Sequence, residues 1–299
     1  MGIVVFNGIS TLDYDITVEQ PPNYTGAKRD YESKHIPGRN GDLILDSGSY
    51  QNVNREYNLA VGSEQKSFAQ LSNILSKWVY SGTGYARLED SYDPDVYRMA
   101  IYNNELQVTN VLNHIARATV SFNCMPQRWL KSGEITHSFF ANLGGNTSVT
   151  LTNPTGQPAK PIITIHIDTN AEMIPDERGL IYFRLIVNNQ EYLSPRNYTV
   201  KGRYVYRIGI PYSEIQNGGQ VKHNMIEIDC ENMTTFLSNN GHNPYNLNPN
   251  CEFTSNTTFK NFIRLYDGQN EIKCSYGKEG PYSATKYTKV EVIPRWWMI

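Results

Sequence analysis

The sequence predicts a mainly β protein with one α-helix in its first third and a β-sandwich in its second half. The chain has 299 residues, including 21 Tyr and 22 Gly. Tyr, Thr, Val and Ile favour strands, whereas Asn and Gly favour turns. In many segments apolar and polar residues alternate, which is the period of a strand with one buried face. The length allows two domains.

Strands are predicted through most of the first third. Residues 3–6 are apolar, and from Leu12 to Val18 apolar residues occupy every second position. Rows with the same period follow at residues 57–61 and 118–124. Because side chains alternate across a strand, each row lies on one face and predicts the buried side of a sheet.

One segment, Ser63 to Ser81, has the period of a helix instead. Its apolar residues are three or four positions apart: Phe68, Leu71, Ile74, Leu75, Trp78 and Val79. That spacing predicts an amphipathic helix that lies on the sheet. We expect Ser63 to cap its start and Gly82 to end it in a left-handed conformation.

An irregular stretch, Ala27 to Leu45, separates two of the early strands. It contains Pro37-Gly38-Arg39-Asn40-Gly41-Asp42, whose glycines permit sharp bends. No Lys-Ser or Lys-Thr pair follows, so the stretch is not a phosphate-binding P-loop. Two interpretations stay open: a turn that connects two strands, or an arm that reaches toward a neighbouring subunit.

A turn-rich stretch between Pro126 and Asn146 predicts a domain boundary. We therefore expect an N-terminal domain at 1–131, a linker at 132–146 and a C-terminal domain at 147–299. The last strand either completes the C-terminal domain or returns to the first.

The second half contains a series of short segments with strand periodicity. Their apolar rows are Ile163 to Ile167, Ile181 to Val187, Tyr204 to Ile210, Ile226 to Cys230, Ile263 to Leu265, Ile272 to Cys274 and Val290 to Val292. Asn188-Asn189 and Asp267-Gly268 are candidate hairpin turns between them. Many short strands separated by turns predict a β-sandwich. The polar stretch 238–258 is too long for a tight turn and predicts a surface insertion.

Charge and composition argue against several classes of protein. The net charge is −2 and the pI about 6.3, so no basic surplus is present to bind nucleic acid. The start lacks the features of a signal peptide, and no apolar run is long enough for a membrane helix. The cysteines, which form no CxxC pair, are expected to be buried free thiols: Cys124, Cys230, Cys251 and Cys274.

We predict no catalytic, cofactor-binding or metal-ligating residue. His166 and Asp168 share a strand face but lack a third ligand, and alternation already explains both as solvent-facing. Glu89-Asp90 and Asp93 with Asp95 could pair as the carboxylates of a glycoside hydrolase. They lie in a Pro-containing turn, however, where Asp is an ordinary residue. The tyrosines suggest sugar stacking as an alternative, although most fall on alternating strand positions where they simply pack.

The order of several motifs resembles the siphophage distal tail protein (Dit) family. The motifs in the first half are Phe6-Asn7-Gly8 with Asp13-Tyr14, the segment 37–41, the helix ending in Trp78, and the runs 84–92, 97–100 and 121–126. Those in the second half are Asn153-Pro154, Pro161-Ile162-Ile163, the run 226–229 and Pro294-Arg295-Trp296-Trp297. They span most of the chain in order, and the stretch 238–258 matches nothing in the family.

The resemblance implies a fold and a role. The fold is an N-terminal β-sandwich-like domain with one α-helix and a β-hairpin arm, followed by a galectin-like C-terminal β-sandwich. The role is structural: a hexameric ring, single or stacked, at the tip of a phage tail. Implied partners are the tail tube protein, the tail-associated lysin or hub protein, and receptor-binding proteins.

The resemblance brings no catalytic residue and no cofactor. It places the protein in the virion after synthesis in the cytoplasm of the host bacterium. The alternative function is a carbohydrate-binding adhesin that contacts the cell wall.

Overall fold

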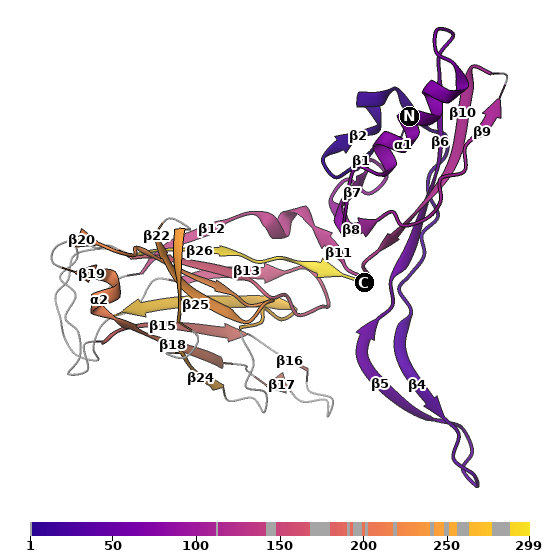
Figure 1. Cartoon of the computed structure of the whole chain (residues 1–299). Helices are drawn as coiled ribbons and strands as arrows, with labels where there is room; N and C mark the ends of the chain where they lie inside the picture. The colour runs from indigo at the N-terminus through magenta and orange to yellow at the C-terminus, as the bar shows by residue number, and fades with distance from the viewer. Residues whose placement is uncertain are drawn as a thin grey trace. The chain divides into compact units, whose positions relative to one another are not determined.

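The structure, a computed structural model, confirms the mainly β fold class. The chain divides into two compact units, Met1–Lys131 with Met298–Ile299, and Ser132–Trp297. Figure 1 labels the elements of both units. The structure describes residues 2–111, 113–141, 148–167, 180–189, 192–193, 199–200, 203–217, 220–239, 242–247, 251–255, 263–276 and 288–299.

The first unit is built on an antiparallel sheet in the order β2-β1-β7-β8-β10-β6-β3, with β9 and β11 pairing with β10 and β8. The rows predicted at 57–61 and 118–124 lie in β6 and β10, which pair along their full length. The strands are β1 (Val4–Phe6), β2 (Ile9–Ser10), β3 (Ile16–Val18), β6 (Val53–Gly62), β7 (Ala86–Asp90), β8 (Val96–Ile101), β9 (Thr109–Val111), β10 (Ile115–Cys124) and β11 (Arg128–Leu130).

The predicted helix packs on this sheet as α1 (Phe68–Val79). Its Trp78 is fully buried, with the ring centroid 5.9 Å from that of Phe122 and 6.4 Å from that of Phe6. The Trp78 Nε1 donates a hydrogen bond to the Ile9 carbonyl at 3.0 Å. Aromatic contacts of this kind contribute about 0.5–1.5 kcal/mol each beyond the area that they bury.

The helix begins and ends differently from the prediction. Its N-cap is Ser67, not Ser63: the Ser67 hydroxyl accepts from the Gln70 backbone N–H, and the Gln70 side chain accepts from the Ser67 N–H. This capping box satisfies two backbone donors at once, which a serine four residues earlier cannot do. At the other end Tyr80 is the C-cap, and Gly82 does not adopt a positive φ.

The strand predicted from residue 12 onward is shorter than expected. Thr11–Tyr14 form the 3-10 helix η1, and only Ile16–Val18 form a strand, β3. Ser10 and Asp13 make a capping box at the start of η1, and the chain leaves it through Asp15 at φ 56°. Local hydrogen bonds from short polar side chains thus override the period-two pattern here.

In its described residues the second unit contains two large antiparallel sheets. Their strand orders are β12-β26-β14-β21-β22-β23 and β13-β25-β15-β18-β24. The first sheet comprises β12 (His137–Ala141), β14 (Ile162–His166), β21 (Met225–Asp229), β22 (Thr234–Asn239), β23 (His242–Asn246) and β26 (Thr288–Ile293). The second comprises β13 (Ser148–Asn153), β15 (Leu180–Asn189), β18 (Arg203–Pro211), β24 (Cys251–Ser255) and β25 (Gly268–Tyr276).

Buried apolar side chains alternate along the strands of both sheets, as in a β-sandwich. They include Ile163, Ile165, Phe183, Leu185, Ile226, Ile228, Ile272, Val290 and Val292. The remaining elements are short: η2 (Lys131–Glu134), α2 (Tyr212–Ile215), the pair β16 (Tyr192–Leu193) and β17 (Thr199–Val200), the pair β19 (Gln216–Asn217) and β20 (Gln220–Val221), and β27 (Trp297–Met298).

Three sequence features of the second half take other forms than expected. Asn188 and Asn189 are not a turn but the end of β15, where they pair with Arg203 and Asn270. The stretch 238–258, predicted as an insertion, supplies β23 to one sheet and β24 to the other. Residues 137–141, within the predicted linker, form the edge strand β12.

Candidate functional site

The stretch interpreted as a turn or an arm is a β-hairpin. Strands β4 (Arg29–Lys34) and β5 (Leu43–Tyr50) pair antiparallel, and Gly38 and Gly41 in the connecting turn have φ of 81° and 79°. Among the described residues, neither strand pairs with any other strand. Figure 1 shows the hairpin projecting from the sheet of the first unit. We call residues 29–50 the arm.

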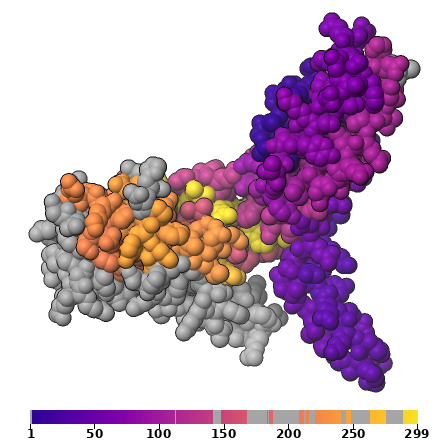
Figure 2. Space-filling model, in the orientation of Figure 1, coloured from indigo at the N-terminus to yellow at the C-terminus, as the bar shows by residue number. Residues whose placement is uncertain are grey.

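Most of the arm's side chains are exposed, including apolar ones. Tyr31, Ile44 and Leu45 are 49%, 54% and 46% exposed. Charged residues lie among them, with an ion pair between Arg29 and Asp46. Figure 2 shows the arm as a strip of surface that extends from the rest of the first unit. Exposed apolar side chains on strands with free edges are typical of a surface that another chain covers.

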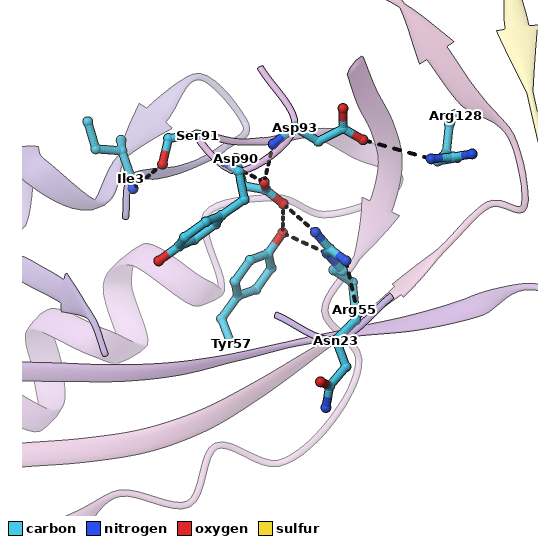
Figure 3. A network of polar contacts seen from close by, with 9 residues as sticks. Ile3, Asn23, Arg55, Tyr57, Asp90, Ser91, Asp93 and Arg128 are labelled. Carbon is cyan, nitrogen blue, oxygen red and sulfur yellow. Dashed lines mark hydrogen bonds and ion pairs between the residues drawn. The ribbon is translucent and has the colours of Figure 1, made fainter. Parts of the chain in front are cut away.

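A buried arginine holds the root of the arm. Arg55 lies on β6, just after the arm, and is 5% exposed. Its Nη1 donates to the Asn23 carbonyl at 2.9 Å, and its guanidinium lies 4.5 Å from the centroid of the Tyr24 ring. Asn23 and Tyr24 precede the arm, so Arg55 connects the segments that enter and leave it. Figure 3 shows the contact of Arg55 with Asn23.

Asp90, at the end of β7, neutralises this arginine. Its Oδ2 accepts hydrogen bonds from Arg55 Nη2 at 3.0 Å and from the Tyr57 hydroxyl at 2.7 Å. Its Oδ1 accepts from the backbone N–H groups of Tyr92 and Asp93. A carboxylate bonded at both oxygens is satisfied by the protein itself, which accounts for its burial. Figure 3 shows these contacts.

The network keeps Arg55 charged and Tyr57 neutral. Burial by itself would lower the pKa of Arg55, but the contacts with Tyr57 and Asp90 outweigh it and raise that pKa. Burial raises the pKa of the Tyr57 hydroxyl, and the Asp90 carboxylate raises it further. Tyr57 therefore acts as a hydrogen-bond donor in this network.

The carboxylates of Glu89 and Asp93 also make structural contacts, and Asp95 makes one through its backbone. Burial would raise the pKa of Glu89, but hydrogen bonds from Lys131 and Arg87 lower it overall. The Asp93 side chain lies 3.8 Å from Arg128, and the Asp95 carbonyl accepts from the Lys131 N–H. These contacts favour the interpretation of residues 89–95 as a strand end and a turn.

A small cavity borders the network and is lined by Tyr24, Arg55, Tyr57, Asp90 and Arg98, among others. Its free volume is about 10 Å³. That is room for about one water molecule, not for a substrate.

The histidine singled out in the sequence is paired with a carboxylate. His166 Nε2 lies 2.8 Å from Glu291 Oε2 on the neighbouring strand β26. Asp168 lies outside the described residues. In the part of the chain that is described, no three His, Cys, Asp or Glu side chains group to hold a metal ion.

The cysteine prediction is confirmed for Cys124, Cys230 and Cys274, which are free and buried. The side chain of Cys251 lies outside the description. Across the described ranges, no helix is long and apolar enough to cross a membrane.

Comparison with solved structures identifies the fold. Over 98% of both chains the protein superimposes on the Dit protein (gp 19.1) of phage SPP1, with a TM-score of 0.59 and 12% sequence identity. The chain has the fold of a phage distal tail protein. That distal tail protein is described as a paradigm of the hub adsorption apparatus in phages that infect Gram-positive bacteria. The likeness confirms, at the level of the fold, the resemblance seen in the sequence.

A fructofuranosidase from Schwanniomyces occidentalis also aligns with the chain, at 7% identity. The alignment covers 88% of this chain and 58% of the enzyme, with a TM-score of 0.23, which supports no inference about fold or activity. No family model and no curated protein sequence matches the chain.

Proposed function

We propose that this protein is a structural subunit of a bacteriophage tail tip, a ring-forming distal tail protein and not an enzyme. The observation that carries the proposal is the shared fold with the SPP1 hub protein over 98% of both chains. A single β-sandwich is a common fold and says little about function. A match that spans both units supports a role like that of the SPP1 protein more strongly.

The arm supports the ring in particular. A cyclic head-to-tail ring uses two different patches on each subunit, one of which must reach the neighbour. The arm has free strand edges in the described structure and exposes Tyr31, Ile44 and Leu45. Strand edges can bind a second chain by backbone hydrogen bonding, with apolar side chains filling pockets.

The proposed assembly is a hexameric ring, single or stacked, at the tip of the virion tail. The N-terminal domain of each chain, residues 1–131, would form the ring between the tail tube protein and the tail-associated lysin or hub protein. The second unit, a galectin-like sandwich, would carry receptor-binding proteins.

Light scattering coupled to size-exclusion chromatography, followed by negative-stain imaging, tests the ring. We expect a closed oligomer whose mass is a multiple of 34.1 kDa. A protein that stays monomeric at every concentration, alone and with its tail partners, would contradict the proposal. Replacing residues 29–50 by a short Gly-Ser turn should abolish the ring while unfolding of the rest stays cooperative. Rings that form without the arm would remove its role.

The carbohydrate-binding adhesin stays a prediction from the tyrosine content. Binding of cell-wall glycans by the full chain is its test.

A further inference from the structure

We propose that Arg55 is a positioning residue that clamps the root of the arm, so that the arm is presented in one direction before a neighbouring subunit binds it. The role of the clamp in assembly rests on the proposed ring function. The clamp itself rests on the contacts that Arg55 makes.

Arg55 contacts the segment through which the chain enters the arm. Residues 19–28 run from β3 to β4, and no strand or helix forms between them. Arg55 holds this segment at Asn23 through a hydrogen bond and at Tyr24 through a cation–π contact. Tyr24 is otherwise largely open to solvent, at 59% exposed.

The segment through which the chain leaves the arm is also held by hydrogen bonds. Asn52 lies between β5 and β6, and its Nδ2 donates to Asn123 Oδ1 at 2.5 Å and to the Tyr85 hydroxyl at 2.6 Å. Gln51 N–H donates to the Lys28 carbonyl at 2.8 Å and joins the two sides of the hairpin. Arg55 ties the entering segment at Asn23 to Asp90, which ends β7.

The chemistry of the guanidinium suits this task. Arginine presents donors in several directions from one plane while its face stacks on an aromatic ring. Here one edge contacts Asp90 and Tyr57, another contacts Asn23, and the face meets Tyr24. A lysine can keep one charged contact with Asp90 but cannot make all three at once.

Fixing the direction of an arm favours its docking. A mobile arm loses conformational entropy when it binds, and that loss weakens binding, whereas a clamped arm has already been ordered during folding. Assembly should therefore be sensitive to Arg55 even if Arg55 never touches the neighbouring subunit.

The direct test measures the arm in the unassembled subunit. Spin labels at Arg39→Cys, in the turn of the arm, and at Lys66→Cys, before α1, are placed in a Cys251→Ser background. Pulsed electron paramagnetic resonance then gives the distribution of the distance between them. Both labelled positions are exposed.

We expect a narrow distribution in the parent and a distribution at least about twice as wide in Arg55→Lys and in Tyr24→Ala, because each removes part of the clamp. Tyr24→Ala changes an exposed side chain and should fold normally. The matched control is Arg128→Lys, which alters the neighbouring ion pair with Asp93 but contacts neither Asn23 nor Tyr24. An unchanged width in Tyr24→Ala and in folded Arg55→Lys would overturn the clamp.

Sedimentation of the same variants, unlabelled, measures assembly. The concentration for half-assembly should rise by about tenfold in Arg55→Lys, since the arm then loses entropy on docking. It should stay unchanged in Arg128→Lys. If the parent forms no ring, the proposed function fails, while the distance distributions still decide whether Arg55 holds the arm. If the ring forms equally well with a mobile arm, the clamp has no role in assembly.

Discussion

Arg55 lies where segments that are distant in sequence meet, and its contacts predict its effect on stability. Replacing it with Met would leave Asp90 buried without its cation. Removing one partner of a buried ion pair costs about 3–5 kcal/mol, so Arg55→Met should lower the free energy of unfolding by that amount. Urea titration followed by tryptophan fluorescence measures the change.

The control is the exposed pair of Arg117 and Glu19, at 2.8 Å, with the arginine side chain 51% exposed. Arg117→Met should cost less than about 1 kcal/mol. Equal losses in the two variants would show that burial does not set the strength of the Arg55 contact.

Glu291 predicts a pH dependence of the second unit. Hydrogen bonds from Lys289 and His166 lower the pKa of this carboxyl below its ordinary value of 4.5. A lowered folded-state pKa stabilises the fold above the unfolded pKa, and the stabilisation is lost as pH falls through the folded pKa. The free energy of unfolding of Glu291→Gln should therefore depend less on pH below about 4.5 than that of the parent. If the free energies of unfolding of Glu291→Gln and of the parent change equally with pH in this range, Glu291 does not stabilise the fold in this way.

Gly133 marks a close backbone approach. A Cβ at this position would lie 2.3 Å from the backbone N of Trp296, and the Gly133 carbonyl accepts from the Arg295 N–H at 2.8 Å. Gly133→Ala must push these segments apart, and we expect a loss of about 2 kcal/mol or more in thermal or urea unfolding. Gly156→Ala is the control, because no atom lies within 4 Å of its Cβ position. Similar stability of both variants would argue against the close approach.

The sequence could not predict the partners of Arg55. Asn23 and Asp90 are 32 and 35 residues away from it, and only the pairing of distant strands brings them together. The sequence did favour structural roles for the residues of the 89–95 turn, since Asp and Pro are ordinary turn residues.

At the scale of single elements, the start of α1 offers a discriminating prediction. The capping box of Ser67 and Gln70 satisfies two backbone N–H groups, so Ser67→Ala should lower stability by about 1 kcal/mol. Ser63→Ala should cost less, because the Ser63 hydroxyl accepts from Gln65 N–H, in the loop before the helix, and not from a helix N–H. Thermal unfolding of both variants measures the two losses of stability. A larger loss for Ser63→Ala would indicate Ser63 as the N-cap, as the sequence predicted.

Elements were predictable where their signal was local. The rows in β6, β10, β14 and β26 were found because period two is visible in a few residues. Strands β23 and β24 were missed for different reasons. β23 is polar and contains two Asn residues, so it lacks that period, whereas β24 has only two alternating apolar residues, Cys251 and Phe253. Both pair with strands elsewhere in the chain. From its residues the arm was found only as an irregular stretch, and the expectation of a β-hairpin came from the family resemblance. Nearly all of its residues are exposed, so no alternating pattern was needed to bury a face.

At the scale of the whole molecule, the buried thiols report on both units. Burial raises the pKa of Cys124 to about 11 and that of Cys274 to about 12. Cys230 is buried in the same way. Because the thiolate is the reactive form, the folded Cys251→Ser protein should react very slowly with a disulfide reagent at pH 8.

Pulses of the reagent along a urea titration, read by mass spectrometry, should label Cys124 when the first unit unfolds and Cys230 with Cys274 when the second unfolds. Rapid labelling of any of them without denaturant would contradict their burial.

The free edges of the arm also affect the solubility of the protein. The single chain exposes a β-ribbon with Tyr31, Ile44 and Leu45 on its surface, and such ribbons can stack non-specifically on one another. Charged neighbours such as Arg29 and Asp46 counter that tendency. Solubility should therefore fall if these charges are removed. In the proposed ring, burial of the ribbon by the neighbouring subunit would protect the protein from precipitation.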